Sequence, residues 1–169
     1  MSKLAQTLIL NHSEILQKIT RMAWQIFENN HNAKSLVIIG VEKKGEIVSG
    51  LIYNALKDIS DLKMNQGSVF IDKENPTLEG ISLKCDQDLN DCNVVLVDDV
   101  LNSGKTLMYA TLPILAQNPR QLQTAILANR DHTRFPIKAD FVGVSLATTL
   151  QEHLQFSKDA KGDMTVYLV

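Results

Sequence analysis

Several features that would assign this chain to a specialised class are absent from its sequence. No stretch of the 169 residues approaches the ~20 consecutive apolar residues of a membrane-spanning helix. The first residues lack the apolar core of a signal peptide. The net charge of −2 gives no basic excess of the kind that indicates nucleic-acid binding. We therefore expect a cytoplasmic protein that does not contact a membrane.

Cysteine is also scarce. Cys85 and Cys92 are the two cysteines of the chain. They lack the tightly spaced pairs and nearby histidines of a zinc site. The sequence therefore predicts two free, partly buried thiols in a reducing compartment.

The chain contains no internal repeat, low-complexity tract or linker that would divide it. Residues 1–169 are therefore expected to form one domain, long enough to bury about two-thirds of its unfolded surface. Helical and strand patterns alternate along it, which predicts an α/β fold with a mostly parallel sheet flanked by helices. Helices are predicted over about 12–29, from Val48 to Ile59, and from the Ser103–Thr106 segment to Leu115. Strands are predicted over 36–41, 94–97, 122–128, 141–146 and 164–169.

Three local signals refine this scheme. Asn11 and Glu14 are spaced like a capping box at the start of the first helix. Pro113 falls inside a predicted helix, which should kink or be re-formed there. The polar segment 72–77 lies between two short strand-like runs and is predicted to be the surface loop of a hairpin-like excursion.

The segment from Val94 to Thr106 carries the most informative pattern. Its aliphatic run predicts a strand buried on both faces, and Asp98 and Asp99 follow at the carboxyl end, where open α/β sheets bind ligands. After a short loop, Ser103–Thr106 opens a predicted helix, whose unpaired amides and dipole make an anion site. Carboxylates that accept hydrogen bonds from hydroxyls thus lie one loop away from amides that bind phosphate. A phosphorylated sugar fits this layout.

Other interpretations of the segment are weaker. A Walker phosphate loop would have glycine at the position of Asp99, so the spacing excludes it. A receiver domain also carries acids at strand ends, but its chemistry needs no phosphate cradle directly after them. A buried strand, a solvated Asp pair and a helix cap form the purely structural alternative. Adjacent acids that close a buried strand are poorly suited to packing alone.

The segment resembles the phosphoribosyl diphosphate (PRPP) motif of type I phosphoribosyltransferases, in which two acids follow a hydrophobic strand and precede a Thr-Gly-x-Thr-like loop. The resemblance implies that Asp98 and Asp99 bind the ribose hydroxyls. It also implies that the 5′-phosphate is wrapped by Asn102, Ser103, Gly104, Lys105 and Thr106. Ser103 replaces the commoner Thr and keeps the hydroxyl.

Gly40–Gly45 follows the first predicted strand, at the same sheet edge as the Asp pair. Its backbone amides and the ammonium groups of Lys43 and Lys44 could bind a diphosphate. In the resembled family this is the diphosphate loop, often ending in Arg-Gly, and Lys44 and Gly45 stand in that place. Lysine supplies charge without the bidentate fork of arginine. A plain solvated turn is the alternative for this segment.

The resemblance extends to the uracil phosphoribosyltransferase/pyrimidine operon attenuator family. Residues 126–132 and 135–143 look like its Val-Asp-Arg-Gly-His and Leu-Pro-Ile-Arg-Ala-Asp-Tyr-Gly stretches. The family adds a small hood over the site and a flexible hairpin-like loop, in which Lys73 stands in place of a closing Arg. It also implies base binding by Asn129, where the family usually has Asp, and by Arg130.

Asn102 carries information about the acceptor base. Purine phosphoribosyltransferases tend to have an Asp at this point, where a carboxylate can shuttle a proton near the purine N7. An amide cannot take up that proton, which favours a pyrimidine; alternatively, Asn102 only serves the turn. His132 and His153 are predicted to be surface hydrogen-bonding residues rather than acid–base groups.

The resemblance therefore implies a PRPP-dependent phosphoribosyltransferase of pyrimidine salvage that acts on a nucleobase, uracil above all, and releases diphosphate. Mg²⁺ would be held mainly through PRPP, no catalytic residue beyond Asp98 and Asp99 is expected, and the family forms homodimers. Departures in the loops leave a nucleotide-sensing, RNA-binding regulator of pyrimidine genes as the alternative, although the net charge of −2 counts against RNA binding. A catalytically idle structural subunit is a third possibility.

Overall fold

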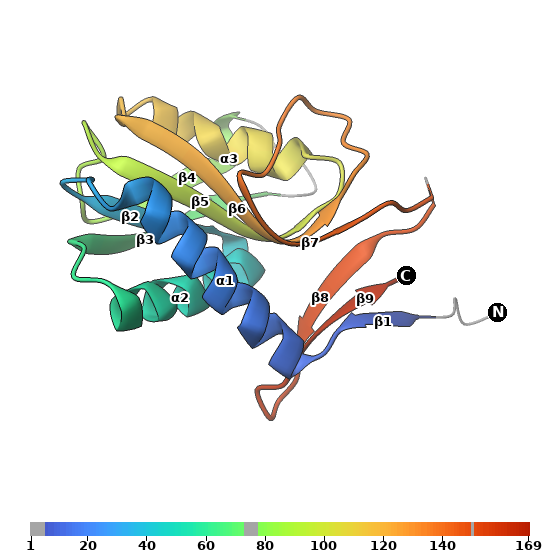
Figure 1. Ribbon diagram of the computed structural model, residues 1–169. Coiled ribbons are helices and arrows are strands. Elements are labelled where there is room, and N and C mark those ends of the chain that lie inside the picture. The colour runs from blue at the N-terminus through green and yellow to red at the C-terminus, as the bar shows by residue number, and fades with distance from the viewer. Residues whose placement is uncertain (1–5, 73–77, 150) are drawn as a thin grey trace.

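The computed structural model describes residues 6–72, 78–149 and 151–169 (Figure 1). The strands of this part of the chain are β1 (Thr7–Leu10), β2 (Leu36–Val41), β3 (Met64–Ile71), β4 (Ile81–Cys85), β5 (Asn93–Leu101), β6 (Gln121–Arg130), β7 (Phe141–Leu146), β8 (Leu154–Lys158) and β9 (Met164–Leu168). The helices are α1 (His12–Asn30), α2 (Glu42–Ile59) and α3 (Lys105–Leu115), with a 3₁₀ turn, η1, at Leu78–Gly80. None of the described helices combines the length and the apolar character needed to cross a membrane.

The larger sheet positions the site. It has six strands in the order β4-β3-β2-β5-β6-β7, and only the edge strand β4 runs antiparallel to its neighbour. Strand β5 lies inside the sheet and pairs with β2 and β6. The predicted α/β fold with a mostly parallel sheet is confirmed. The carboxyl ends of the parallel strands therefore meet at one edge, where ligands bind in such sheets.

Helices cover both faces of this sheet (Figure 1). Val95 and Val97 of β5 belong to the buried cluster that contains the apolar faces of α1 and α2. Val94 and Leu96 belong to the second cluster, together with the apolar face of α3. Neighbouring residues of a strand point to opposite faces, so an unbroken aliphatic run is what a strand covered on both faces requires. This burial fixes the strand that carries the Asp pair.

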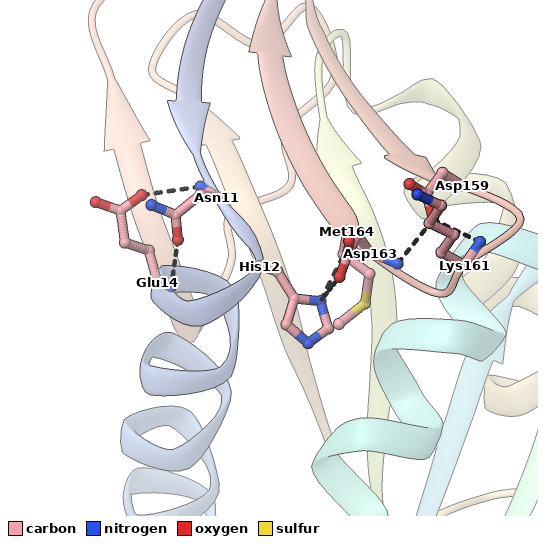
Figure 2. Close-up of polar contacts among 7 residues, drawn as sticks. All are labelled: Asn11, His12, Glu14, Asp159, Lys161, Asp163 and Met164. Atoms are coloured by element: carbon pink, nitrogen blue, oxygen red, sulfur yellow. Dashed lines mark hydrogen bonds and ion pairs between the residues drawn. The ribbon is translucent and has the colours of Figure 1, made fainter.

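The first helix begins at a capping box, as predicted. The Asn11 side-chain oxygen accepts a hydrogen bond from the Glu14 N–H at 3.0 Å, and the Glu14 carboxylate accepts one from the Asn11 N–H at 2.8 Å (Figure 2). These bonds satisfy amides that the helix itself leaves without partners. The observed span, His12–Asn30, agrees with the prediction.

The segment after β2 differs from the prediction. Strand β2 ends at Val41 and α2 begins at Glu42, so Gly40–Gly45 is not a loop but the end of a strand and the first turn of a helix. A Cβ on Gly45 would lie 2.8 Å from the Val97 carbonyl oxygen and 3.2 Å from Asp98 Oδ1. Only a residue without a side chain allows this approach. The start of α2 consequently packs on β5 beside Asp98.

Two further elements continue past their predicted ends. Strand β5 runs to Leu101, because its pairing with β6 continues beyond the Asp pair to Leu101 opposite Asn129. Helix α3 continues through Pro113 to Leu115, so the helix does not end and re-form at the proline. Pro113 has no N–H to donate to the Tyr109 carbonyl, but it stands close to the end of the helix, where few turns remain to be disturbed.

The hairpin-like excursion is confirmed as an antiparallel pairing of β3 and β4, from Gly67 opposite Cys85 to Ile71 opposite Ile81. Its tip, including the predicted loop residue Lys73, lies outside the described residues. Both cysteines are free thiols, as predicted: Cys85 is half-buried and Cys92 is buried.

A second sheet of three strands, in the order β1-β9-β8, lies next to the larger sheet (Figure 1). We call it the hood (residues 7–10, 154–158 and 164–168). The sequence predicted β9 but missed β1 and β8. Leu10, Phe156 and Val166 anchor the hood in the same buried cluster as α1 and α2. The hood is thereby held to the body by apolar packing.

Polar contacts also tie the hood to the start of α1 (Figure 2). Nδ1 of His12, the first residue of α1, accepts a hydrogen bond from the Met164 N–H at 3.2 Å. The turn between β8 and β9 is closed by the Asp159 carboxylate, which accepts hydrogen bonds from the Lys161 and Asp163 N–H groups at 2.8 and 2.9 Å. The turn end of the hairpin that carries β8 is thus fixed both within itself and against α1.

Candidate functional site

Asp98 and Asp99 lie within β5, close to its carboxyl end, and are 5% and 7% exposed. The Asp98 carboxylate accepts a hydrogen bond from the Asp99 N–H at 2.9 Å. Carboxylates are seldom buried without a polar role, because leaving water costs free energy. Both side chains line a cavity at this edge of the sheet.

The loop between β5 and α3 lines that cavity. Gly104 precedes α3 with φ of +84°, a left-handed conformation that favours glycine, and turns the chain into the helix. Ser103 Oγ accepts a hydrogen bond from the Lys105 N–H at 3.2 Å. The Ser103 carbonyl accepts bonds from the Arg134 and Phe135 N–H groups at 2.8 and 3.2 Å. These bonds fix the loop at the start of α3, where the amides of a helix lack partners within the helix itself.

The cavity has a volume of about 240 Å³ and is enclosed by three parts of the chain. The first part is the segment Asp98–Leu107, of which only Lys105 does not line the cavity. The second is Lys44 at the start of α2, and the third is the hood strand β8. The lining residues are Lys44, Asp98, Asp99, Val100, Leu101, Asn102, Ser103, Gly104, Thr106, Leu107, Leu154, Gln155 and Phe156.

The contribution of β8 was missed by the sequence analysis. Leu154 and Phe156 are buried and Gln155 between them is exposed, which is the period-two pattern of a strand with one covered face. That pattern was available in the sequence, but it spans too few residues to stand out. Nothing in the sequence indicated that this strand meets the Asp98–Thr106 segment.

The two predicted diphosphate lysines are placed differently. The Lys44 ammonium group donates a hydrogen bond to the Phe156 carbonyl at 2.8 Å and lines the cavity. Lys43 is exposed and is not among the lining residues, and neither is Lys105 of the phosphate segment. Gly45 lies under the cavity, against Asp98. The structure thus gathers the Asp pair, the Asn102–Gly104 loop, Thr106 and Lys44.

Asn129 and Arg130 lie outside this cavity. Asn129 donates a hydrogen bond to Ser145 Oγ at 3.1 Å. The guanidinium group of Arg130, 6% exposed, donates to the Thr149 carbonyl at 3.2 Å and lies 3.2 Å from His153 Nδ1. Both residues line neighbouring cavities; one of about 300 Å³ contains Arg130 and His153 and shares Asn102 and Ser103 with the site.

The charge of Arg130 is matched by a carboxylate on the segment that leads into the hood. The Thr149 N–H donates a hydrogen bond to Glu152 at 2.8 Å. Hydrogen bonds from Thr149 lower the pKa of Glu152 below its ordinary value, and the charge of Arg130 acts in the same direction. The Glu152 carboxylate is therefore charged at neutral pH, and the charge that faces Arg130 is lost only as the pH falls through the lowered pKa of Glu152.

Chemically, the site combines two buried carboxylates, the start of a helix and one ammonium group. A model of the phosphoribosyl transferase domain matches residues 5–160, and the chain belongs to this family. It is accordingly a PRPP-dependent pentosyltransferase, as the sequence predicted.

The resemblance to the pyrimidine operon family is confirmed by curated relatives named "Bifunctional protein PyrR". The protein of Macrococcus caseolyticus is 31% identical in an alignment of 169 residues. This alignment covers 95% of this chain and 97% of the relative. The protein of Clostridioides difficile is 31% identical over 157 residues, 88% of this chain and 89% of the relative.

Solved structures share the fold. A hypoxanthine phosphoribosyltransferase of Trypanosoma cruzi aligns with a TM-score of 0.77 at 18% identity over 95% of each chain. A hypoxanthine-guanine phosphoribosyltransferase of Bacillus anthracis aligns with a TM-score of 0.70 at 17% identity over 83% of this chain and 82% of its own. At these identities the likeness concerns the fold and not the acceptor base.

Proposed function

We propose that the chain transfers the phosphoribosyl group of PRPP to a pyrimidine base, uracil, and releases diphosphate. The observation that carries the proposal is the pair of buried carboxylates, Asp98 and Asp99, in one cavity with Ser103, Gly104 and Thr106 of the predicted phosphate segment. The pyrimidine acceptor is supported by the PyrR relatives.

The proposed mechanism needs no protein nucleophile. The 5′-phosphate would bind the amides at the start of α3 together with the hydroxyls of Ser103 and Thr106. Asp98 and Asp99 would accept hydrogen bonds from the ribose hydroxyls and, as anions, favour the positive charge that develops on the sugar as diphosphate leaves. Lys44, at the opposite wall, would compensate the charge of the diphosphate.

The site fits a magnesium ion held mainly by its substrate. Among residues 6–72, 78–149 and 151–169, no group of three or more His, Cys, Asp or Glu side chains is placed to hold a metal ion. Asp98 and Asp99 alone are too few to form a complete magnesium site, because Mg²⁺ requires octahedral oxygen coordination. The ion would supply charge compensation for the leaving diphosphate, with most of its oxygen ligands from PRPP and water.

A calorimetric titration with PRPP, with and without Mg²⁺, followed by uracil in the same cell, tests the proposal. We expect Mg²⁺-dependent PRPP binding and heat of turnover when uracil is added. A parallel panel of bases identifies the acceptor: turnover with purines alone would exclude uracil, and absence of PRPP binding would exclude the proposed function.

A second candidate function is favoured by the word "bifunctional" in the name of the relatives. It is nucleotide-dependent binding of pyrimidine-gene leader RNA, with weak or no catalysis. RNA binding through phosphates falls steeply with salt, so a gel shift at rising salt concentrations tests it. No shift at low salt, with and without uridine monophosphate (UMP), would exclude this candidate.

A homodimer and a cytoplasmic location also belong to the proposal. Met108, Leu112 and Leu115 form an exposed apolar stripe on α3, at spacings that place them on one helix face. Such a stripe is typical of contact surfaces.

A further inference from the structure

Strand β8 turns a free backbone edge toward the site. It is the outer strand of the hood sheet, paired only with β9 among the described strands. His153 and Val169 exchange both backbone hydrogen bonds, at 2.8 and 2.9 Å. In an antiparallel pair the bonded residues alternate, so the peptide groups of Leu154 and Phe156 point away from β9. They point to the cavity, which both residues line.

Two side chains of the site bind this edge. The Asn102 amide donates to the Leu154 carbonyl and its oxygen accepts from the Leu154 N–H, both at 3.3 Å. In this orientation the carboxamide nitrogen of Asn102 meets a carbonyl oxygen and its oxygen meets an N–H, so each contact joins a donor to an acceptor. Lys44 binds the next inward-pointing carbonyl, that of Phe156, at 2.8 Å. The phosphate loop and the start of α2 thus each hold β8 by one side chain.

The Asn102 contact joins the phosphate loop to the hood. The backbone of Asn102 belongs to the loop that follows β5, while its side chain points away from that loop to a strand far along the chain. Its carbonyl oxygen and one amide hydrogen are engaged by Leu154. Neither the turn nor a base contact, the two alternatives left open by the sequence, describes this arrangement.

Resting on the proposed function, we propose that Asn102 is a positioning residue that sets the register of hood strand β8 over the acceptor side of the sugar site. The bond pair fixes Leu154 against the loop that holds the 5′-phosphate, so the hood and the sugar are held at a defined separation. The cavity lies between the loop and β8, and on the proposed function the acceptor base would bind there. Asn102 therefore contributes to acceptor binding and not to sugar-phosphate binding.

Asn and Asp at position 102 differ in the hydrogen bonds that they can make to Leu154, because an amide has both a donor and an acceptor and a carboxylate has acceptors alone. A carboxylate can accept from the Leu154 N–H, but it has no hydrogen to donate to the Leu154 carbonyl and would face that oxygen with negative charge. An Asp here would hold one of the two contacts and repel the other. The bond pair thus requires the amide, whichever base is transferred.

The test compares two ligands that differ only in the base: ribose 5-phosphate and UMP. Calorimetry gives the dissociation constants of both for the unaltered protein, Asn102→Ala, Asn102→Asp and the control Asn65→Ala. Asn65 is also half-buried, and its amide donates to Gln87 Oε1 at 3.2 Å away from the site. We expect Asn102→Ala to weaken UMP binding about ten-fold, as the loss of two neutral hydrogen bonds predicts. Ribose 5-phosphate binding should stay within about two-fold of the original value, and Asn102→Asp should be at least as impaired toward UMP.

Each other result overturns the inference. Tighter UMP binding by Asn102→Ala would mean that Asn102 occupies the place of the base. Weaker binding of both ligands would make it part of the phosphate site, and unchanged binding of both would leave it without a role. If the unaltered protein binds no PRPP in the presence of Mg²⁺, the proposed function itself fails, and the inference with it; if it binds PRPP but not ribose 5-phosphate, PRPP replaces ribose 5-phosphate in the comparison. A uracil KM that rises in Asn102→Ala at an unchanged PRPP KM is the kinetic counterpart of the expected result.

Discussion

Asp99→Asn is expected to weaken PRPP binding about a hundred-fold while the protein stays folded. Each hydrogen bond from a hydroxyl to a buried carboxylate contributes about 1.5–3 kcal/mol, and every 1.4 kcal/mol corresponds to about a factor of ten in affinity. Asp99 is nearly buried beside the phosphate loop, so water screens its charge little. Asparagine keeps the shape but removes the charge and one acceptor. Calorimetric titration with PRPP in the presence of Mg²⁺ measures the change.

Two companion variants make this result specific. Asp98→Asn should weaken PRPP binding as well, and because Asp98 also accepts from the Asp99 N–H it should cost some stability in addition. Asp58→Asn, at an exposed position of α2, should leave the affinity unchanged. Equal PRPP affinity in Asp99→Asn and the unaltered protein would show that the ribose site is assigned wrongly.

Gly143→Ala is expected to lower the free energy of unfolding by about 3 kcal/mol or more, which corresponds to a fall in Tm of about 6–12 °C. A Cβ on Gly143 would lie 2.3 Å from the Leu127 carbonyl oxygen and 3.1 Å from its carbonyl carbon. Both atoms belong to the backbone of β6, which is paired on both sides and cannot retreat. The Gly143 carbonyl also accepts a hydrogen bond from Arg21 of α1 at 2.6 Å, so a shift of β7 would strain that contact too.

Gly50→Ala provides the matched control. Gly50 lies in the middle of α2, and a Cβ there would meet no atom within 4 Å. Because alanine favours the helix over glycine, we expect this variant to gain about 0.5–1 kcal/mol of stability. Thermal unfolding of both variants decides the matter. If Gly143→Ala melted at the temperature of Gly50→Ala, the close packing of β6 and β7 described here would be wrong.

The sequence was most informative where a pattern repeats locally. The aliphatic run before Asp98 predicted a doubly covered strand because burial on both faces leaves no room for polar residues, and β5 has that environment. The capping box placed the start of α1 because its two bonds involve residues only three positions apart. The prediction went wrong at Gly40–Gly45, where glycine and lysine suggested a loop. There the glycine instead allows a helix to pack against a strand, and such a contact is not visible in local sequence.

The sequence alone determined the α/β fold, the strand that carries Asp98 and Asp99, the loop and helix start that follow them, and the family. These depend on hydrophobic periodicity and on residues adjacent in the chain, whose chemistry and spacing can be read directly. The tertiary structure decided which predicted residues meet: it brought Lys44 and β8 to the Asp pair, and it placed Lys43, Lys105, Asn129 and Arg130 outside that cavity. It also joined Asn102 to Leu154 across 52 positions. Such contacts arise only when distant elements pack, and packing depends on the shape of the whole core rather than on any local pattern.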